Sequence, residues 1–522
     1  MKMVKSLLLG TAAGLVAVAG AQAADMPVKA KPVLYVKICS LYGDGFYYIP
    51  GTDICLKLGG YVRAQHSWNY GQNVTTGPFG QPNQLNTRIG GQTDWTFRTR
   101  SLISVDTRQQ TEYGTLRTYF TIGHTGDSPN AEGLYVNRGF IQFAGFTFGL
   151  ASSFFDFYSA PIVSYTATPT EDTGDGGWRV MAYTANFGNG VTSTISLEEP
   201  RRYSVVNTQL GCVGTAGLAG VTCPGTAAFN ANNTTVGFAF NDPFLVGAAP
   251  TPDQVTIRFP DIVMNWRVDQ AWGAAMIAGV VHDASAGYYG TSITGSITQG
   301  HPADKLGWVA SAGLRLNAPN GSFFQIQGSF TEGATKYIVH SSWGGSSPAR
   351  FGVGNSLGLG WVSDAVYGTG SEVELTRAWG VYAAYDHVWW AGSKVRTSLY
   401  GGYVKFDYND NATALIRNAT CGNFPLSGGT SAAAAATGGS LTGMSNCDPD
   451  FAFAYIGSRT QYNFTPDFYM GVDFLYSKLY TAFRGTANYR AVANTARQSG
   501  TYNIEDQDNF AVTVRIHRDF KP

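Results

Sequence analysis

Residues 56–68 read Leu-Lys-Leu-Gly-Gly-Tyr-Val-Arg-Ala-Gln-His-Ser-Trp. In this stretch the polarity of the side chains alternates between even and odd positions. The even positions from Leu56 to Trp68 are mostly apolar, whereas the odd positions include Lys57 and Arg63. Successive side chains of a β-strand point to opposite faces, so the stretch predicts a strand with one apolar and one polar face. Alternation over about ten residues is typical of a strand that crosses a membrane between lipid and a polar lumen. Strands of soluble sandwiches are usually about half as long.

The same alternation recurs along the chain and marks sixteen segments. We predict strands at roughly 55–68, 94–108, 114–124, 135–144, 145–152, 179–187, 190–199, 255–269, 271–283, 306–317, 321–333, 372–388, 393–408, 451–463, 467–482 and 508–520.

The connections between these segments differ in length in a regular way. Short turns rich in Gly, Asn and Pro alternate with long connections rich in Gly, Ser and Thr, such as 200–254, 334–371 and 409–450. An even strand number with short turns at one rim and long loops at the other predicts a transmembrane antiparallel β-barrel. The fold class is therefore all-β, and about 16 strands make a barrel wide enough for an aqueous channel.

Composition excludes several other classes of protein. The 522 residues include 35 basic and 35 acidic side chains, and only 13% are charged, whereas 65 are glycine. Soluble globular domains carry about 25% charged residues, and a nucleic-acid-binding protein needs a basic field. Aromatic residues make up 14% of the chain, which argues against intrinsic disorder. We expect no nucleic-acid partner.

The N-terminal residues predict export. Lys2 and Lys5 precede an apolar run from Leu7 to Ala19, and Ala21-Gln22-Ala23 fits the rule for a signal-peptide cleavage site. No other stretch has the 18 or more apolar residues of a membrane helix. We therefore divide the chain into a signal peptide, an N-terminal periplasmic segment and a barrel, at 1–23, 24–55 and 56–520.

Six cysteines agree with an oxidising compartment, because they form three near pairs in sequence. These pairs are Cys39 with Cys55, Cys212 with Cys223, and Cys421 with Cys447. An even count at short separations predicts three local disulfides. A metal site would require closely spaced cysteines or histidines, and no such spacing occurs. We expect neither a metal nor a cofactor.

Aromatic side chains lie near the ends of the predicted strands. Rings at both membrane interfaces form the girdles of transmembrane barrels. The predicted girdle consists of Trp68, Trp95, Trp178, Trp272, Trp308, Trp389, Trp390 and Tyr480.

Motifs typical of enzymes are weak. Residues 354–358 spell Gly-x-Ser-x-Gly, but a nucleophile elbow needs a strand, a sharp turn and a helix, and this region is a glycine-rich connection. Asp172-Thr173-Gly174 is typical of aspartic proteases, but it occurs once, without a partner carboxylate. We expect no enzymatic activity.

Several blocks of sequence resemble the alphaproteobacterial porins, in order from the N-terminus to the last strand. They are Cys39–Gly43, Gly45–Cys55, Gly60–Arg63, Phe140–Gly149, Ser153–Asp156, Pro260–Val263, Arg267–Gly273 and Ile456–Gln461. The resemblance implies a trimeric, sixteen-stranded porin in the outer membrane of a Gram-negative bacterium. It implies passive diffusion of small hydrophilic solutes and ions, with outer-membrane lipids around the barrel.

In that family the third long loop folds into the lumen, and here it corresponds to residues 153–178. The segment contains Glu171, Asp172 and Asp175 close to flexible glycines. We expect these side chains to form an acidic lip at a pore constriction. The alternative is a solvated acidic turn at the outer rim.

Strand parity places five arginines on the lumen faces of the first four strands: Arg63, Arg98, Arg100, Arg117 and Arg138. A basic residue on the lipid face at mid-bilayer costs about 2–4 kcal/mol, which enforces this parity. We expect a basic ladder opposite the acidic loop, and the resulting field would orient polar solutes. The alternative is that the arginines pair with nearby carboxylates and merely complete the wall.

Three functional hypotheses follow from the sequence. A general porin would have a large conductance, and its transport would show little saturation by any solute. A substrate-specific channel would have a saturable site, often a track of aromatic rings, but Tyr61, Tyr119 and Tyr382 form no evident track. A structural or adhesive barrel would have a plugged lumen and would use its long loops.

Overall fold

The structure of the chain is a computed structural model. The structure describes residues 38–69, 95–128, 132–166, 168–208, 257–289, 300–340, 349–351, 355–360, 362–390, 392–420, 439–489 and 500–520. The predicted signal peptide, the predicted disulfide between Cys212 and Cys223, and Cys421 lie outside these residues.

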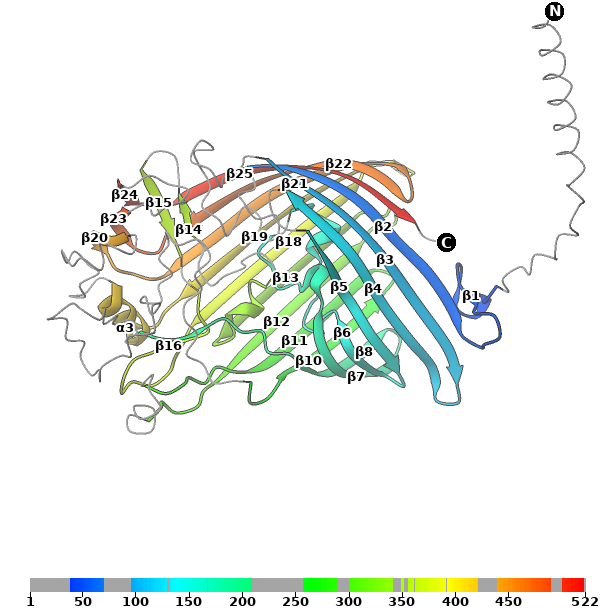
Figure 1. Cartoon of the computed structure of the whole chain (residues 1–522), viewed down its shortest axis with the longest axis horizontal. Coiled ribbons are helices and arrows are strands. Elements are labelled where there is room, and N and C mark those ends of the chain that lie inside the picture. Colours follow the sequence, from blue (N-terminus) through cyan, green and yellow to red (C-terminus); the bar gives the residue numbers. More distant parts are fainter. Residues whose placement is uncertain are drawn as a thin grey trace, which may run out of the picture.

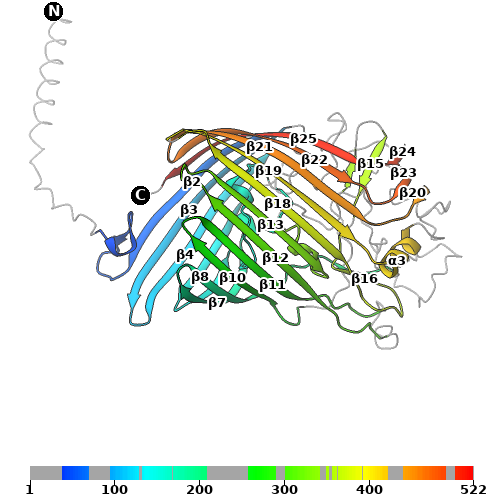
Figure 2. The same cartoon turned by 180° about the vertical axis from the view of Figure 1, so that it is seen from behind.

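Sixteen antiparallel strands form one closed barrel (Figures 1 and 2). They are β2 (Cys55–Trp68), β3 (Trp95–Thr111), β4 (Gly114–Ser128), β5 (Glu132–Phe143), β6 (Phe146–Ala151), β7 (Trp178–Gly188), β8 (Val191–Glu198), β10 (Asp261–Gln270), β11 (Gly273–Asp283), β12 (Leu306–Asn317), β13 (Phe323–Glu332), β18 (Arg377–Val388), β19 (Val395–Asp407), β21 (Phe451–Thr465), β22 (Phe468–Tyr480) and β25 (Gln507–Phe520). The barrel closes because β2 pairs with both β3 and β25. The predicted fold class is confirmed.

Short turns join the strands at one rim, and long connections join them at the other. Turns such as the one between β7 and β8 use left-handed backbone at Gly188, Asn189 and Gly190, which explains their residue types. At the opposite rim, parts of the long connections form two small sheets and a helix (Figure 1). These elements are β9 (Val205–Asn207), β14 (Ala349–Phe351), β15 (Ser356–Leu359), β16 (Ala365–Tyr367), β17 (Glu374–Leu375), α3 (Asp410–Thr420), β20 (Gly439–Asn446), β23 (Arg484–Tyr489) and β24 (Gly500–Ile504).

The two faces of the barrel wall follow the predicted parity. On β3 the side chains of Trp95, Phe97 and Ile103 are exposed on the outside. The predicted girdle is also exposed, with the exception of Trp178. The Trp178 ring instead packs edge-on against His340 at a centroid distance of 4.9 Å, so it belongs to the barrel interior. Among the described residues, no helix has the length and hydropathy of a membrane span.

Part of the interior is occupied by packed connections. The strand β16 pairs in parallel with β9, although the two are far apart in sequence, and Val205, Val206, Ala365 and Val366 are buried. Further short 3-10 turns lie in the connections, at η5 (Ala160–Ile162), η6 (Gly174–Gly176) and η7 (Thr335–Tyr337). A hydrophobic cluster joins these connections to the inner faces of β18, β19 and β21, through residues such as Tyr158, Tyr382 and Phe453. The lumen is therefore narrowed on one side by protein.

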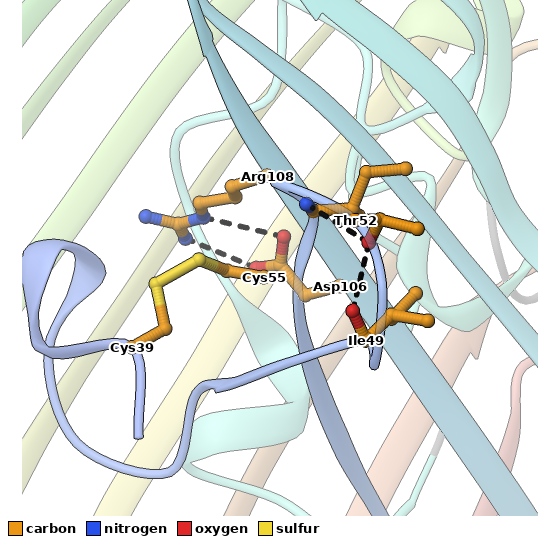
Figure 3. The surroundings of a disulfide bond; sticks show 7 residues. Cys39, Ile49, Thr52, Cys55, Asp106 and Arg108 are labelled. Atoms are coloured by element: carbon orange, nitrogen blue, oxygen red, sulfur yellow. Dashed lines mark hydrogen bonds and ion pairs between the residues drawn. A yellow bond between two sulfur atoms is a disulfide. The ribbon is translucent and has the colours of Figure 1, made fainter. Parts of the chain in front are cut away.

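A disulfide fastens the N-terminal segment to the barrel at the rim with the short turns (Figure 3). Cys39 bonds to Cys55, the first residue of β2, as predicted. The turn η2 (Ser40–Tyr42) and the two-residue strand β1 (Tyr47–Tyr48) lie between them, and β1 pairs with β2. Cys447 is also disulfide-bonded, with its partner outside the described residues, so its predicted pairing with Cys421 stays a prediction.

Candidate channel lining

The connection between β6 and β7, residues 152–177, lies inside the barrel. We call it the inward segment. Its backbone carbonyls accept hydrogen bonds from inward-facing side chains of five different wall strands. These bonds join Asn265 Nδ2 to Phe154 O at 2.6 Å, Gln325 Nε2 to Ser159 O at 3.1 Å, Arg459 Nη1 to Ile162 O at 2.8 Å, Ser398 Oγ to Val163 O at 2.5 Å, and Arg515 Nη2 to Tyr165 O at 2.8 Å. The segment therefore follows the inner wall from β10 round to β25.

Asp473 on β22 holds the middle of the inward segment. Its buried carboxylate accepts hydrogen bonds from Ser164 Oγ at 2.9 Å and from the Tyr165 backbone nitrogen at 2.6 Å. Tyr400 on β19 donates to the other carboxylate oxygen at 2.6 Å. Several donors offset the cost of burying a carboxyl group, and the bonds fix the backbone that donates to it. The path of the segment is thus set by wall side chains.

Arg201, just after β8, holds both ends of the inward segment. Its guanidinium is fully buried and donates to Asp156 Oδ1 at 2.8 Å and to the Glu171 carbonyl at 2.8 Å. Its backbone nitrogen donates to Asp261 Oδ2 at 3.0 Å, and the guanidinium carbon lies 4.6 Å from the ring centroid of Tyr337. This arginine was missed in the sequence, because it lies in a long connection where strand parity assigns no face.

Two of the three predicted acidic residues, Glu171 and Asp172, are not fully exposed, and the predicted acidic lip stays a prediction. Glu171 is fully buried, and burial raises the pKa of its carboxyl group well above the ordinary value. Asp172 is half-buried, and its carboxylate accepts backbone hydrogen bonds from Ala160 at 3.2 Å and Gly174 at 2.7 Å. The structure does not describe the side chain of Asp175. Asp172 thus fixes the backbone of the inward segment, whereas both carboxyl oxygens of Glu171 are buried without a hydrogen-bond partner among the described residues.

All five predicted arginines lie on inward faces, but their partners differ. Arg98 makes a two-pronged ion pair with Asp127, with both distances at 2.7 Å. Arg117 makes a similar pair with Asp106, with both distances at 3.0 Å. For these two residues the contacts agree with the alternative in which arginines pair with nearby carboxylates.

Arg63 and Arg100 are direct neighbours across the β2–β3 pair. Arg100 donates to Thr125 Oγ1 at 3.0 Å, and Arg63 donates to the Tyr61 hydroxyl at 3.2 Å. Both residues are half-buried on the inner face of the wall. Two adjacent cations on one wall produce a local positive potential inside the barrel.

Arg138 connects the arginine-bearing wall to the inward segment. It donates to Gly174 O at 2.9 Å and to Ser152 Oγ at 3.1 Å. Part of the acidic stretch therefore lies beside Arg138, on the wall that carries the arginines. The sequence predicted that the acidic loop would face the arginines from the other side of the pore. The reason for the difference is that the segment turns back toward β7, whose neighbour β6 pairs with β5.

The serine of the Gly-x-Ser-x-Gly motif lies in a strand and not in a turn between a strand and a helix. Ser356 lies in β15, which pairs with β14 and β24, and its hydroxyl donates to Gln507 Oε1 at 3.4 Å. Within the described ranges, no group of three or more His, Cys, Asp or Glu side chains is arranged to hold a metal ion.

A closed sixteen-stranded barrel with an apolar outer face, a charged inner face and an inward segment defines the class of outer-membrane channel proteins. Residues 25–512 match the family described as the Porin subfamily, and the chain belongs to this family. Membership places the chain in the outer membrane and among non-enzymatic proteins.

Individual relatives agree with this assignment. The chain is 34% identical over 209 residues to porin Omp2b of Brucella canis and 33% identical to that of Brucella melitensis. Each match covers 38% of this chain and 54% of the relative, so the chain spans about half the length of the curated relatives it matches. Among solved structures, it is similar in fold to the outer membrane channel DcaP of Acinetobacter baumannii. The TM-score is 0.52, with 13% identity and coverage of 91% of this chain and 99% of that one.

Proposed function

We propose that the chain forms a water-filled channel through which small hydrophilic solutes and ions diffuse passively across the outer membrane. The observation that carries this proposal is the inner face of β2–β5, where guanidinium groups remain partly accessible inside a closed barrel. The side chain of Arg117 is 28% exposed there even though it is ion-paired. Charged groups stay accessible in a barrel interior only where water solvates them.

The test is the conductance of the purified full-length chain in a planar bilayer with potassium chloride on both sides. We expect stepwise insertion of open channels whose current rises in proportion to voltage. Protein that inserts intact but carries no ions would overturn the proposal. It would indicate a plugged barrel, in which the packed connections fill the whole lumen.

We also propose that the narrowest part of the pore lies between the inward segment and the wall that carries Arg63 and Arg100, with Arg98, Arg117 and Arg138 on the same wall. Asp127 and Asp106 neutralise two of these arginines. Burial raises the pKa of Glu171 and disfavours its charged form, which weakens its negative contribution. These contacts support a constriction with net positive potential, and hence a preference for anions.

We propose that the channel is a homotrimer that buries the wall of β5–β8. A strand that spans a bilayer needs about 9–11 residues, but β6 has 6 residues and β8 has 8. Large apolar side chains on this low wall are exposed, including Phe146, Phe148 and Leu197. A neighbouring subunit would cover this part of the wall, whose strands are too short to span the hydrocarbon layer.

Electrophoresis without heating, together with the mass of the detergent-solubilised protein, tests this assembly. We expect Phe148→Gln with Leu197→Gln to convert trimers to monomers. The matched change Leu399→Gln, an exposed position on β19, should leave the trimer intact. Wild-type protein that runs as a monomer would overturn the proposal.

A further inference from the structure

A cavity of about 510 Å³ lies between the inner wall of β4–β11 and the first residues of the inward segment. Ligand pockets for small molecules typically enclose about 300–1,000 Å³. The cavity is distinct from the wall of β2 and β3 that carries Arg63 and Arg100. It opens to the lumen, so a solute in transit would reach it.

Short polar side chains from rigid strands line much of this cavity. Thr147, Thr184, Thr192 and Thr194 present hydroxyl groups, and Gln142 and Asn265 present amides. Hydroxyls and amides both donate and accept hydrogen bonds. Such a lining matches a solute whose own groups both donate and accept, as alcohol hydroxyls do.

Asn265 has an acceptor that the protein does not use. The residue is 5% exposed, and its Nδ2 donates to Phe154 O at 2.6 Å. A carbonyl oxygen only accepts, so this bond establishes which amide atom is nitrogen. Oδ1 then has no hydrogen-bond partner among the described residues. Buried polar atoms in proteins are almost always paired. This oxygen is itself shielded from solvent, so a donor from a solute or water reaches it only when neighbouring side chains shift.

Aromatic rings form another part of the lining. The rings of Tyr119 and Phe140 stack with centroids 5.3 Å apart. The Arg117 guanidinium lies 5.2 Å and 5.4 Å from the two centroids, which keeps these rings in place. A flat apolar surface beside convergent polar groups suits a ring with apolar C–H faces and polar edges.

Charged groups at the cavity are engaged within the protein. Asp156 pairs with Arg201 at 2.8 Å, and Arg267 pairs with Asp269 at 2.7 Å. Arg138 donates to Gly174 O and Ser152 Oγ. The ion-paired Asp156 and Arg267 offer little net attraction to an ion. Arg138 donates to neutral acceptors and keeps its charge, so the comparison of glucose with succinate below decides whether the site prefers a neutral solute.

From these contacts we propose that the cavity is a binding subsite for a neutral polyhydroxylated solute of monosaccharide size, which slows its passage and makes its transport saturable. The Asn265 amide and the threonine hydroxyls bind the solute hydroxyls, and the Tyr119–Phe140 pair contacts its C–H face. This subsite rests on the proposed function, because a solute reaches it only through an open pore.

The test uses single channels of the purified full-length protein, titrated with glucose as the probe. We expect the ion current to fall toward a plateau as glucose increases, whereas a polyethylene glycol of similar size lowers the current in proportion to its concentration. Asn265→Leu and Thr192→Val should each raise the half-saturating glucose concentration by about 3- to 10-fold, the effect of one neutral hydrogen bond. Thr513→Val, on the inner face of β25 away from the cavity, should leave it unchanged.

The outcomes separate the two proposals. A channel that carries no ions fails the proposed function itself. A conducting channel whose glucose response is linear, or whose saturation is the same in wild type and Thr192→Val, overturns the subsite alone. Saturation by succinate but not by glucose would also overturn it, because the site would then bind organic anions. Thr192 is half-buried, and Thr192→Val keeps the branched shape of the side chain and removes only its hydroxyl group, so this variant keeps the test valid if Asn265→Leu fails to fold.

Discussion

Arg201 Nη2 lies 2.8 Å from Asp156 Oδ1, and this buried ion pair joins the start of the inward segment to the chain that leaves β8. The same guanidinium donates to the carbonyl of Glu171, near the other end of the segment. One side chain therefore closes the inward segment into a loop from within the barrel.

Replacement of Arg201 by Met should release the inward segment. Removal of one partner from a buried ion pair typically costs about 3–5 kcal/mol, because the other charge stays buried. We expect a changed mean conductance and larger current fluctuations in single channels. Arg179→Met is the control, since Arg179 pairs with Glu199 but its side chain is 73% exposed. Identical current traces for Arg201→Met and wild type would contradict the role of Arg201 as an anchor.

Arg100→Gln should shift the reversal potential in a salt gradient toward cation preference. Its guanidinium lies across the strand pair from Arg63, and removal of one of two neighbouring cations lowers the positive potential on this wall. The double variant Arg98→Gln with Asp127→Asn removes a neutral ion pair and should leave the reversal potential close to that of wild type. Equal shifts in the two proteins would show that the arginine contacts do not set selectivity.

Glu171 should make the inward segment more stable at low pH. Burial raises the pKa of this carboxyl group above its ordinary value of 4.5. Its contribution to stability is therefore complete below about pH 4.5 and is lost as the pH rises through the raised pKa. Hydrogen exchange of peptides spanning residues 168–178, corrected for intrinsic rates, should show protection that declines with pH. Glu171→Gln should keep the protection at high pH, and a decline that persists in this variant would assign the effect to another group.

Loss of the Cys39–Cys55 disulfide should loosen the N-terminal segment without affecting conduction. The bond closes a loop with a sequence separation of 16, for which the chain-entropy estimate is about 3 kcal/mol. The segment also contacts the barrel through Arg108, whose guanidinium lies 4.9 Å from the Phe46 ring centroid. In Cys39→Ser with Cys55→Ser we expect faster proteolysis between residues 40 and 54 and unchanged single-channel conductance. A lower conductance would mean that this segment reaches the pore.

Gly60→Ala should impair closure of the barrel. A Cβ atom at this position would lie 2.1 Å from the Leu102 carbonyl oxygen and 2.5 Å from the Phe520 ring. Backbone cannot move aside as a flexible side chain can, so the β2–β3 or β2–β25 pairing must shift. We expect a lower yield of folded protein, measured by the electrophoretic shift on heating, whereas Gly133→Ala meets no atom within 4 Å and should fold normally.

The barrel strands were predictable because lipid and lumen impose opposite demands on alternate side chains. In β2 and β3 every second residue is constrained, and parity alone assigns Arg63 and Arg100 to the interior. The pairing of β9 with β16 was not predictable, because no periodicity connects Val205 with Ala365. Burial of Glu171 was not predictable either, since it depends on Arg201 and on wall strands distant in sequence. Sequence pattern thus determined the wall, whereas the filling of the lumen required tertiary structure.

The pairing of β2 with β25 also has a consequence for biogenesis. Gly60 opposes Phe520, so the seam joins the first and the last of the described wall strands. A chain that stops before β25 leaves an unpaired strand edge at β2 and another at β22, which hydrocarbon does not tolerate. Stable insertion into hydrocarbon therefore requires β25, because only this strand pairs with both open edges. A chain without β25 therefore cannot form the closed barrel.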